Sequence, residues 1–293
     1  MMPQYPVYIP SKGRADSRLT MKVLDRMRVP YRVVVEEQEL EAYAAVIDRS
    51  RLLVLDPAYK RAYDCCDEFG LLKSTGSGPA RNFIWDHAVS EGHAWHWIMD
   101  DNIRSFVRLN RGQLRYLGDG TGFRVIEDFC ARYLNVAMAG LHYKFFISAS
   151  HRHKPYKLNT RIYSCNLIRN DVPYRWRARY NEDTDLSLRM LKDGWCTVLF
   201  ACFLQWKTAT QVLKGGNTDE IYKGGDTLPK SRMLVKLHPD VARLVMRYGR
   251  AHHHVDYRGF THALVRRPDA VVRVGVNDYG LREVPRARRI QNG

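Results

Sequence analysis

The stretch Trp95–Ile103 constrains the fold most strongly, because a short apolar run ends abruptly in charge. Five apolar or aromatic positions lead into Asp100, Asp101 and Asn102, which predicts a buried central strand with polar residues at its carboxyl end. In an open α/β sheet, ligands bind beyond the carboxyl ends of the strands. Two adjacent carboxylates repel each other there unless a cation lies between them, and Mg²⁺ or Mn²⁺ is such a cation. The alternative is a strand followed by an ordinary Asp-Asn turn.

The net charge of +16 over 293 residues indicates a polyanionic partner, nucleic acid before membrane surface. The length suits one substantial core with an appended lobe. No apolar run approaches the roughly 18 residues of a membrane span, and the first residues lack a signal-peptide pattern. We therefore expect a cytoplasmic protein without a membrane partner. The six cysteines show no Cys-x-x-Cys spacing and are expected to be reduced thiols.

Strands alternate with helices in the first half of the chain, which predicts an α/β fold with a mostly parallel sheet. The expected strands cover residues 5–10, 31–36, 52–55, 95–99, 105–109 and 195–203, with helices near 16–27, 37–47, 79–90, 124–138 and 181–193. Two further β-like segments are expected at 144–149 and 161–169.

Two loops carry cationic side chains to the starts of helices. Pro10-Ser11-Lys12-Gly13-Arg14 follows the first strand, and Arg81 lies in the first turn of the helix that leads to Trp95. Backbone N–H groups at a helix start, together with such cations, can bind a nucleotide. The alternative is that Lys12 and Arg14 belong to an ordinary βα turn and that Arg81 is a solvated helix residue.

The segment Tyr174–Tyr180 alternates arginine with aromatic residues, a composition that binds phosphates and stacks on bases. Its candidate nucleic-acid contacts are Arg175, Trp176, Arg177 and Arg179. A helix start follows, with Asn181 as its expected N-cap and acids in its first turn. These acids would complement the helix dipole in any case, which leaves a role in a site open.

The carboxyl-terminal part is rich in glycine and arginine. Lys214-Gly215-Gly216-Asn217 is a loop that could fold over a pyrophosphate or simply be mobile. Residues 243–293 hold eleven arginines and no lysine, which makes them a candidate polyanion surface. Of the three imidazoles in His252–His254, at most one or two could reach a shared metal.

These pieces, in this order, resemble a nucleotide-sugar glycosyltransferase of the GT-A fold. Specifically, the chain is similar to the TET/JBP-associated glycosyltransferases of phages, which are linked to sugar addition on hydroxymethylated pyrimidines in DNA. The resemblance covers most of the chain and is carried by Ile9–Arg14, Ala80–Asn82, Asp100–Ile103, Asn181–Leu186 and Lys214–Asn217.

The resemblance implies a role for each motif. Asp100 and Asp101 take the place of an Asp-x-Asp motif that holds a metal ion and the donor diphosphate, although Asn102 replaces the second acid. Glu182 and Asp183 resemble the acidic pair from which inverting members draw their base, and Asp183 is our choice. The expected donor-binding residues are Pro10, Ser11, Lys12, Arg14, Arg81, Asp100, Lys214, Gly215, Gly216 and Asn217, and the expected metal ligands are Asp101 and Asp100. Many GT-A enzymes add a late histidine, but no motif selects among residues 252–254.

The expected reaction moves a sugar from a UDP-sugar to the hydroxyl of 5-hydroxymethylcytosine or 5-hydroxymethyluracil in double-stranded DNA, with Mn²⁺ or Mg²⁺ and inversion. A base stacked on Tyr174–Tyr180 would present its hydroxyl to Asp183.

We expect a GT-A core over residues 1–210, with a nucleotide-sugar half at 1–104 and an acceptor half at 105–210. Residues 211–293 would form an extension that closes the site and contacts polyanion. The protein would be a monomer or weak oligomer, in the host cytoplasm if viral.

Other functions remain open. A metal-dependent nuclease could use the carboxylates at 100, 101, 182 and 183 to clamp two metal ions on a phosphate. A catalytically inactive DNA-binding module would also suit the charge, and a protein or polysaccharide hydroxyl is an alternative acceptor. No residue selects the sugar.

Overall fold

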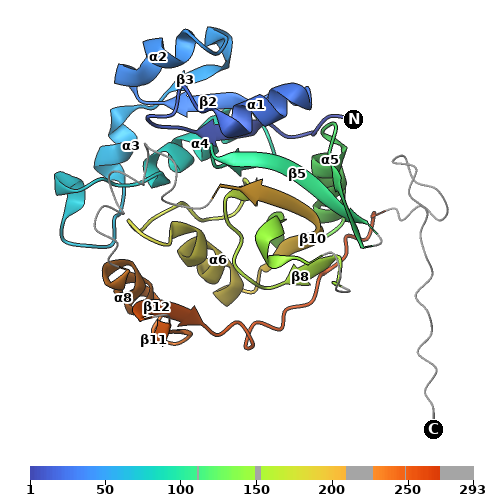
Figure 1. Ribbon diagram of the computed structural model, residues 1–293. Coiled ribbons are helices and arrows are strands. Elements are labelled where there is room, and N and C mark those ends of the chain that lie inside the picture. The colour runs from blue at the N-terminus through green and yellow to red at the C-terminus, as the bar shows by residue number, and fades with distance from the viewer. Residues whose placement is uncertain (111, 149–152, 209–226, 248, 271–293) are drawn as a thin grey trace.

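One mixed β-sheet organises the molecule (Figure 1). The computed structural model describes residues 1–110, 112–148, 153–208, 227–247 and 249–270. The strand order across the sheet is β3-β2-β1-β4-β9-β7-β10-β5-β6, and β8 pairs with β10. From the strand pairings, β3, β2, β1, β4, β7, β10 and β6 run in one direction, and β9, β5 and β8 run in the other. The predicted α/β fold with a mixed, mostly parallel sheet is confirmed.

The amino-terminal half forms the parallel part of the sheet. Its strands are β1 (Val7–Pro10), β2 (Arg32–Val35), β3 (Leu52–Val54) and β4 (Trp95–Met99). Its helices are α1 (Leu19–Arg26), α2 (Leu40–Ala44), α3 (Pro57–Ala62) and α4 (Gly78–Ser90), with short 3₁₀ turns η1 (Glu37–Glu39), η2 (Arg49–Arg51) and η3 (Gly70–Leu72).

The second half adds the antiparallel neighbours and a carboxyl-terminal unit. Its sheet strands are β5 (Ile103–Asn110), β6 (Gln113–Tyr116), β7 (Val136–Tyr143), β8 (Tyr156–Leu158), β9 (Cys165–Arg169) and β10 (Cys196–Lys207). The helices are α5 (Thr121–Ala131), η4 (Lys144–Phe146), α6 (Glu182–Lys192) and α8 (Leu228–Leu237), and the hairpin β11 (Ala242–Arg247)–β12 (Arg250–Val255) follows.

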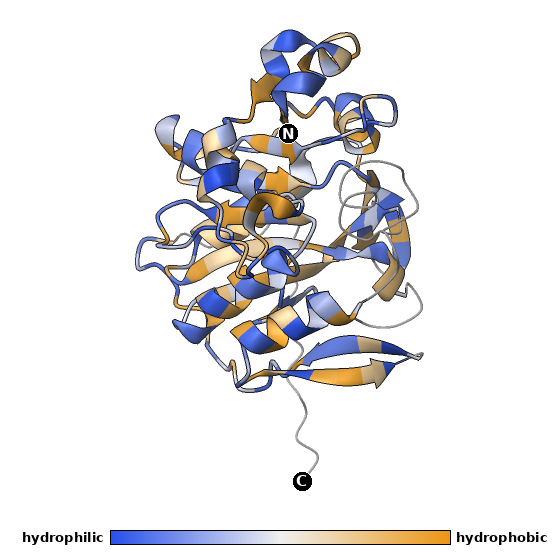
Figure 2. Ribbon diagram, turned by 90° about the vertical axis from the view of Figure 1, so that its left-hand side faces the viewer, coloured by the Kyte–Doolittle hydropathy of each residue, from blue (hydrophilic) through white to orange (hydrophobic). Residues whose placement is uncertain are grey.

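Two apolar layers bury the central strand β4 on both faces. Trp97 packs in the cluster that includes Phe123 of α5, whereas Ile98 packs in the cluster that includes Trp85 of α4. All five residues of β4 are buried, as expected for a strand that is apolar at successive positions. The strands near the centre of Figure 2 accordingly show the hydrophobic colour.

Two predicted elements differ from the structure. The helix expected over 124–138 ends at Ala131, because the apolar residues from Val136 onward form β7 between β9 and β10. The β-like segment expected at 144–149 begins instead as the 3₁₀ turn η4. In the first case sheet pairing, which local pattern does not encode, decides the conformation.

The carboxyl-terminal unit of α8, β11 and β12 packs against α6. Leu188 of α6 shares a buried cluster with Leu234, Ala242 and Val255. The Nε2 atom of His238 lies 2.9 Å from an oxygen of Asp185, which is fully buried on α6. Among the described residues, no helix has the length and apolar character needed to cross a membrane.

Candidate active site

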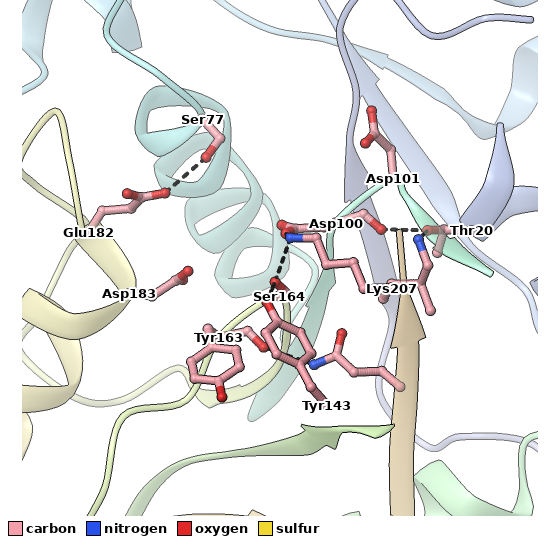
Figure 3. Close-up of polar contacts among 12 residues, drawn as sticks. Thr20, Ser77, Asp100, Asp101, Tyr143, Tyr163, Ser164, Glu182, Asp183 and Lys207 are labelled. Carbon is pink, nitrogen blue, oxygen red and sulfur yellow. Dashed lines mark hydrogen bonds and ion pairs between the residues drawn. The ribbon is translucent and has the colours of Figure 1, made fainter. Parts of the chain in front are cut away.

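A cavity of about 580 Å³ opens at the carboxyl ends of β1 and β4. Nine residues expected in the site line it together: Pro10, Ser11, Lys12, Arg14, Arg81, Asp100, Asp101, Glu182 and Asp183. Its other walls include residues that the sequence did not indicate, among them Glu36, Tyr143, Arg161, Tyr163, Ser164 and Lys207. The structure therefore brings the two acidic clusters, about eighty positions apart in the sequence, into one cavity (Figure 3). We refer to it below as the acidic pocket.

Thr20 of α1 fixes the turn that follows β4. The hydroxyl of Thr20 donates to the carbonyl of Asp100 at 2.5 Å and accepts from the backbone N–H of Ile103 at 2.9 Å. The backbone N–H of Asp100 donates to the carbonyl of Ser164 at 2.7 Å. Because these bonds fix the backbone on both sides, the two aspartates point in different directions from one turn (Figure 3).

Arg81 joins the two acidic clusters. Its side chain is only 3% exposed, with Nη2 3.0 Å from Asp100, and with Nη1 2.5 Å from Asp183 and 3.6 Å from Glu182. Its guanidinium also lies over the Trp176 ring, 4.5 Å from the centroid. A buried guanidinium among three carboxylates stays charged, since nearby anions favour the cation.

Lys207, at the end of β10, neutralises the other oxygen of Asp100. The Nζ atom lies 2.5 Å from Asp100 Oδ2 and donates to Ser164 Oγ at 2.9 Å. Burial alone would raise the pKa of Asp100, but the charges of Lys207 and Arg81 lower it to about 2. Asp100 is therefore ionised at neutral pH. Lys207 followed an apolar strand in the sequence and carried no signal of its own.

Asp101 faces the loop after β1. One of its oxygens accepts from Ser11 Oγ at 2.8 Å, and the other forms an ion pair with Arg14. Ser11 Oγ in turn lies 2.7 Å from the Tyr43 hydroxyl. Burial raises the pKa of Asp101, and the Arg14 charge opposes that rise. The predicted cationic loop thus lies against the predicted acidic turn.

Glu182 and Asp183 begin α6 on the opposite wall. Burial raises the pKa of both carboxyls, that of Glu182 to about 7, while Arg81 opposes the rise in each. Glu182 accepts from Ser77 Oγ at 3.3 Å at the start of α4, whereas Asp183 lies on the side of Tyr163 (Figure 3). Arg81 is closer to Asp183 than to Glu182, so a single proton resides preferentially on Glu182.

The carboxyl-terminal hairpin contributes to the same cavity. Arg247, His252 and His253 line it, and burial lowers the pKa of His253 to about 4, so its ring is neutral at neutral pH. His254, the third candidate, is not among the lining residues.

Within the described ranges, no group of three or more His, Cys, Asp or Glu side chains could hold a metal ion. Lys214, Gly215, Gly216 and Asn217 lie outside the described residues.

The arginine–aromatic run does not form the expected stacking surface. Trp176 is 2% exposed and lies under Arg81, while Arg179 is 3% exposed and pairs with Asp67 at 2.6 Å. The two remaining arginines are also paired, Arg177 with Asp185 at 3.1 Å and Arg175 with Asp86 at 2.8 Å. The run holds α4, α6 and the 64–74 loop together, and Trp176 and Arg179 are too buried to receive a base.

The α/β sheet places cations and Asp100–Asp101 at the carboxyl ends of its strands, where open α/β sheets bind their ligands, and Glu182–Asp183 line the same cavity from the start of α6. The TET-Associated Glycosyltransferase family model matches residues 5–216. The chain therefore belongs to this glycosyltransferase family, which confirms the resemblance and the GT-A-like fold. No curated protein compared with the chain matches it.

Proposed function

We propose that this protein transfers a sugar from a UDP-sugar to the hydroxyl of 5-hydroxymethylcytosine or 5-hydroxymethyluracil in DNA, with inversion at the sugar. The observation that carries the proposal is the convergence of Asp100–Asp101 and Glu182–Asp183 in the acidic pocket, where Arg81 joins them. Glycosyltransferase activity follows from the family, and the donor, the acceptor and the inversion are the proposed parts.

The lining of the acidic pocket contains both apolar and charged residues, which together suit a nucleotide sugar. The lining includes apolar residues from β1, β2 and the segment after β3, beside which a nucleobase would lie: Pro10, Val34, Val35 and Leu55. Glu36 also lines the pocket and pairs with Lys60 at 2.7 Å and Lys12 at 3.0 Å. Arg14 and Lys207 lie at the acidic turn, where a diphosphate would meet their charges.

The donor set at the acidic turn fits a bound Mg²⁺ or Mn²⁺. Mg²⁺ is commonly held by one or two carboxylates together with substrate phosphates and water rather than by a protein cage. Asp101 and Asp100 offer hard oxygen ligands at the pocket wall, and Asp100 is ionised at neutral pH. When bound, the ion would offset the charge that grows on the leaving diphosphate. Arg14 and Ser11 would have to release Asp101 for it to serve as a ligand.

Asp183 is the proposed base. A base must be ionised before it accepts the proton of the acceptor hydroxyl, and the ion pair with Arg81 favours the ionised form of Asp183. Glu182, whose pKa burial raises to about 7, would hold the proton that the two carboxylates share. The hydroxyl oxygen then bonds to the sugar carbon as the bond to the diphosphate breaks, and its proton passes to Asp183.

The net charge of the protein and its family support DNA as the acceptor. A net charge of +16 has little use with a small neutral acceptor, but each phosphate neutralised on a duplex releases counterions. A two-metal nuclease is less well supported, because Arg81 lies between Asp100 and Asp183 where the carboxylates would have to share metal ions.

The test measures UDP released from a panel of UDP-sugars with Mn²⁺. We expect release to rise when hydroxymethylated duplex DNA is added and to stay at the background rate with an unmodified duplex of the same sequence. Equal release with both duplexes would argue against the DNA acceptor. Nicking of a plasmid in Mg²⁺, without sugar-nucleotide turnover, would favour the nuclease.

A further inference from the structure

Four exposed aromatic residues and Lys144 form a surface that begins at the acidic pocket, which we call the aromatic strip: Tyr116, Lys144, Phe145, Phe146 and Trp206. Phe145 is 89% exposed, Tyr116 70%, Phe146 57% and Trp206 40%. Soluble proteins rarely leave large apolar side chains contiguous at the surface without a binding role. The strip comes from η4 and from the ends of β6 and β10.

Contacts join the members of the strip from η4 to Trp206 and to the acidic pocket. The rings of Phe145 and Phe146 lie 5.4 Å apart, and Phe146 lies 6.1 Å from Tyr143, with both Phe146 and Tyr143 lining the acidic pocket. Lys144 Nζ lies 4.3 Å from the centre of the Trp206 ring. One end of the strip is therefore the pocket mouth.

The other end of the strip is a second hollow, which residues of α1, β5, β6 and the end of β10 line. Tyr116 and Trp206 line it, and the charged side chains in its lining are Arg26 and Arg104. Exposed aromatic rings interspersed with cations are the features that bind nucleic acid, since rings stack on bases and cations meet phosphates. This composition was expected at residues 174–180, but there Trp176 and Arg179 are buried.

We propose that the aromatic strip is the surface on which the acceptor DNA docks, and that Phe145 enters the base stack beside the target nucleotide. Inserted apolar side chains partly unstack a base step, and enzymes that act on a base extrude it from the duplex. The extruded base passes Phe146 into the acidic pocket, toward Asp183. Lys144 contacts the phosphate backbone next to Trp206. This inference rests on the proposed DNA acceptor and locates it on the molecule.

The test measures equilibrium binding of a fluorescent hydroxymethylated duplex without any sugar nucleotide, over a series of salt concentrations. F145A should weaken binding by about fivefold or more, because a stacked base loses its ring. K144A should lower the slope of log affinity against log salt by about one, because one phosphate contact is lost. A 2-aminopurine placed beside the target base should brighten with the wild-type protein and much less with F145A.

The matched control is L72A, which removes an apolar side chain of the same 89% exposure from η3. It should bind like the wild type, and thermal melting should show that both variants are folded. The inference is overturned if F145A binds like the wild type, if L72A is equally weakened, or if the wild type binds no duplex. Because no donor is present, a protein that needs Phe145 for binding but transfers no sugar would contradict only the proposed function.

Discussion

Arg81 donates to Asp183 across 2.5 Å, and this ion pair links the first turn of α4 to the first turn of α6. The same guanidinium reaches Asp100 at the end of β4. A single buried cation thus sets the spacing of the acidic clusters and biases which carboxylate carries a proton.

Removal of the proposed base should nearly abolish sugar transfer. We expect D183N to lower turnover by about 10²–10⁴-fold, the usual contribution of a positioned base. E182Q should lose less, because glutamine resembles the protonated form that we assign to Glu182. Wild-type turnover should fall as the pH falls, since the base must be ionised and burial raises the pKa of Asp183. The readout is which variant loses more turnover. A larger loss in E182Q than in D183N would assign the role of base to Glu182.

Loss of Arg81 should destabilise the fold as well as the site. R81A leaves three carboxylates near one another without their shared cation. The free energy of unfolding, measured in urea, should therefore fall by about 3–5 kcal/mol. R49A is a suitable control, because Arg49 forms an exposed ion pair with Glu41 that is worth less than about 1 kcal/mol. Similar stabilities for the two variants would contradict the role of Arg81.

Asp185 should matter for stability and not for chemistry. It is fully buried, pairs with His238, Arg177 and Arg189, and is not among the residues that line the acidic pocket. Burial would raise the pKa of Asp185, but His238 and Arg177 lower it to about 2. We expect D185N to lower the free energy of unfolding by about 3 kcal/mol while the folded enzyme keeps its turnover.

The stabilisation from Asp185 should depend on pH in a definite direction. Its pKa is lower in the folded protein than the roughly 3.9 of an unfolded chain, so its contribution is complete above about pH 5 and is lost progressively as the pH falls through 4 toward 2. The difference in unfolding free energy between wild type and D185N should therefore shrink over that window. A difference that stays constant from pH 6 to pH 2.5 would contradict the lowered pKa.

Removal of divalent metal should suppress transfer. After treatment with EDTA we expect turnover to fall to background and to return with Mn²⁺ or Mg²⁺, with D101N poorly rescued because a ligand is lost. Full activity in EDTA would instead assign the neutralisation of the diphosphate to Arg14 and Lys207, which already lie at the acidic turn.

The sequence predicted features that depend on local residue pattern, such as strand ends and helix starts. The abrupt change from the apolar residues of β4 to Asp100 placed the acidic turn at a strand end, and Asn181 is the N-cap of α6 as expected, although its side chain bonds to the carbonyl of Lys230 instead. The alternation of arginine and aromatics at 174–180 was predicted to stack on bases, but Trp176 and Arg179 are buried and all three arginines of the run form ion pairs within the protein. Lys207 escaped notice, since only sheet pairing brings the end of β10 beside Asp100.

The most direct test is mass spectrometry of nucleosides from hydroxymethylated DNA incubated with the protein, Mn²⁺ and a panel of UDP-sugars. The account predicts a hydroxymethylpyrimidine nucleoside heavier by one sugar residue with the wild-type protein, and only a trace with D183N. Unmodified nucleosides with every donor, from a protein shown to be folded, would contradict the transfer of sugar to DNA.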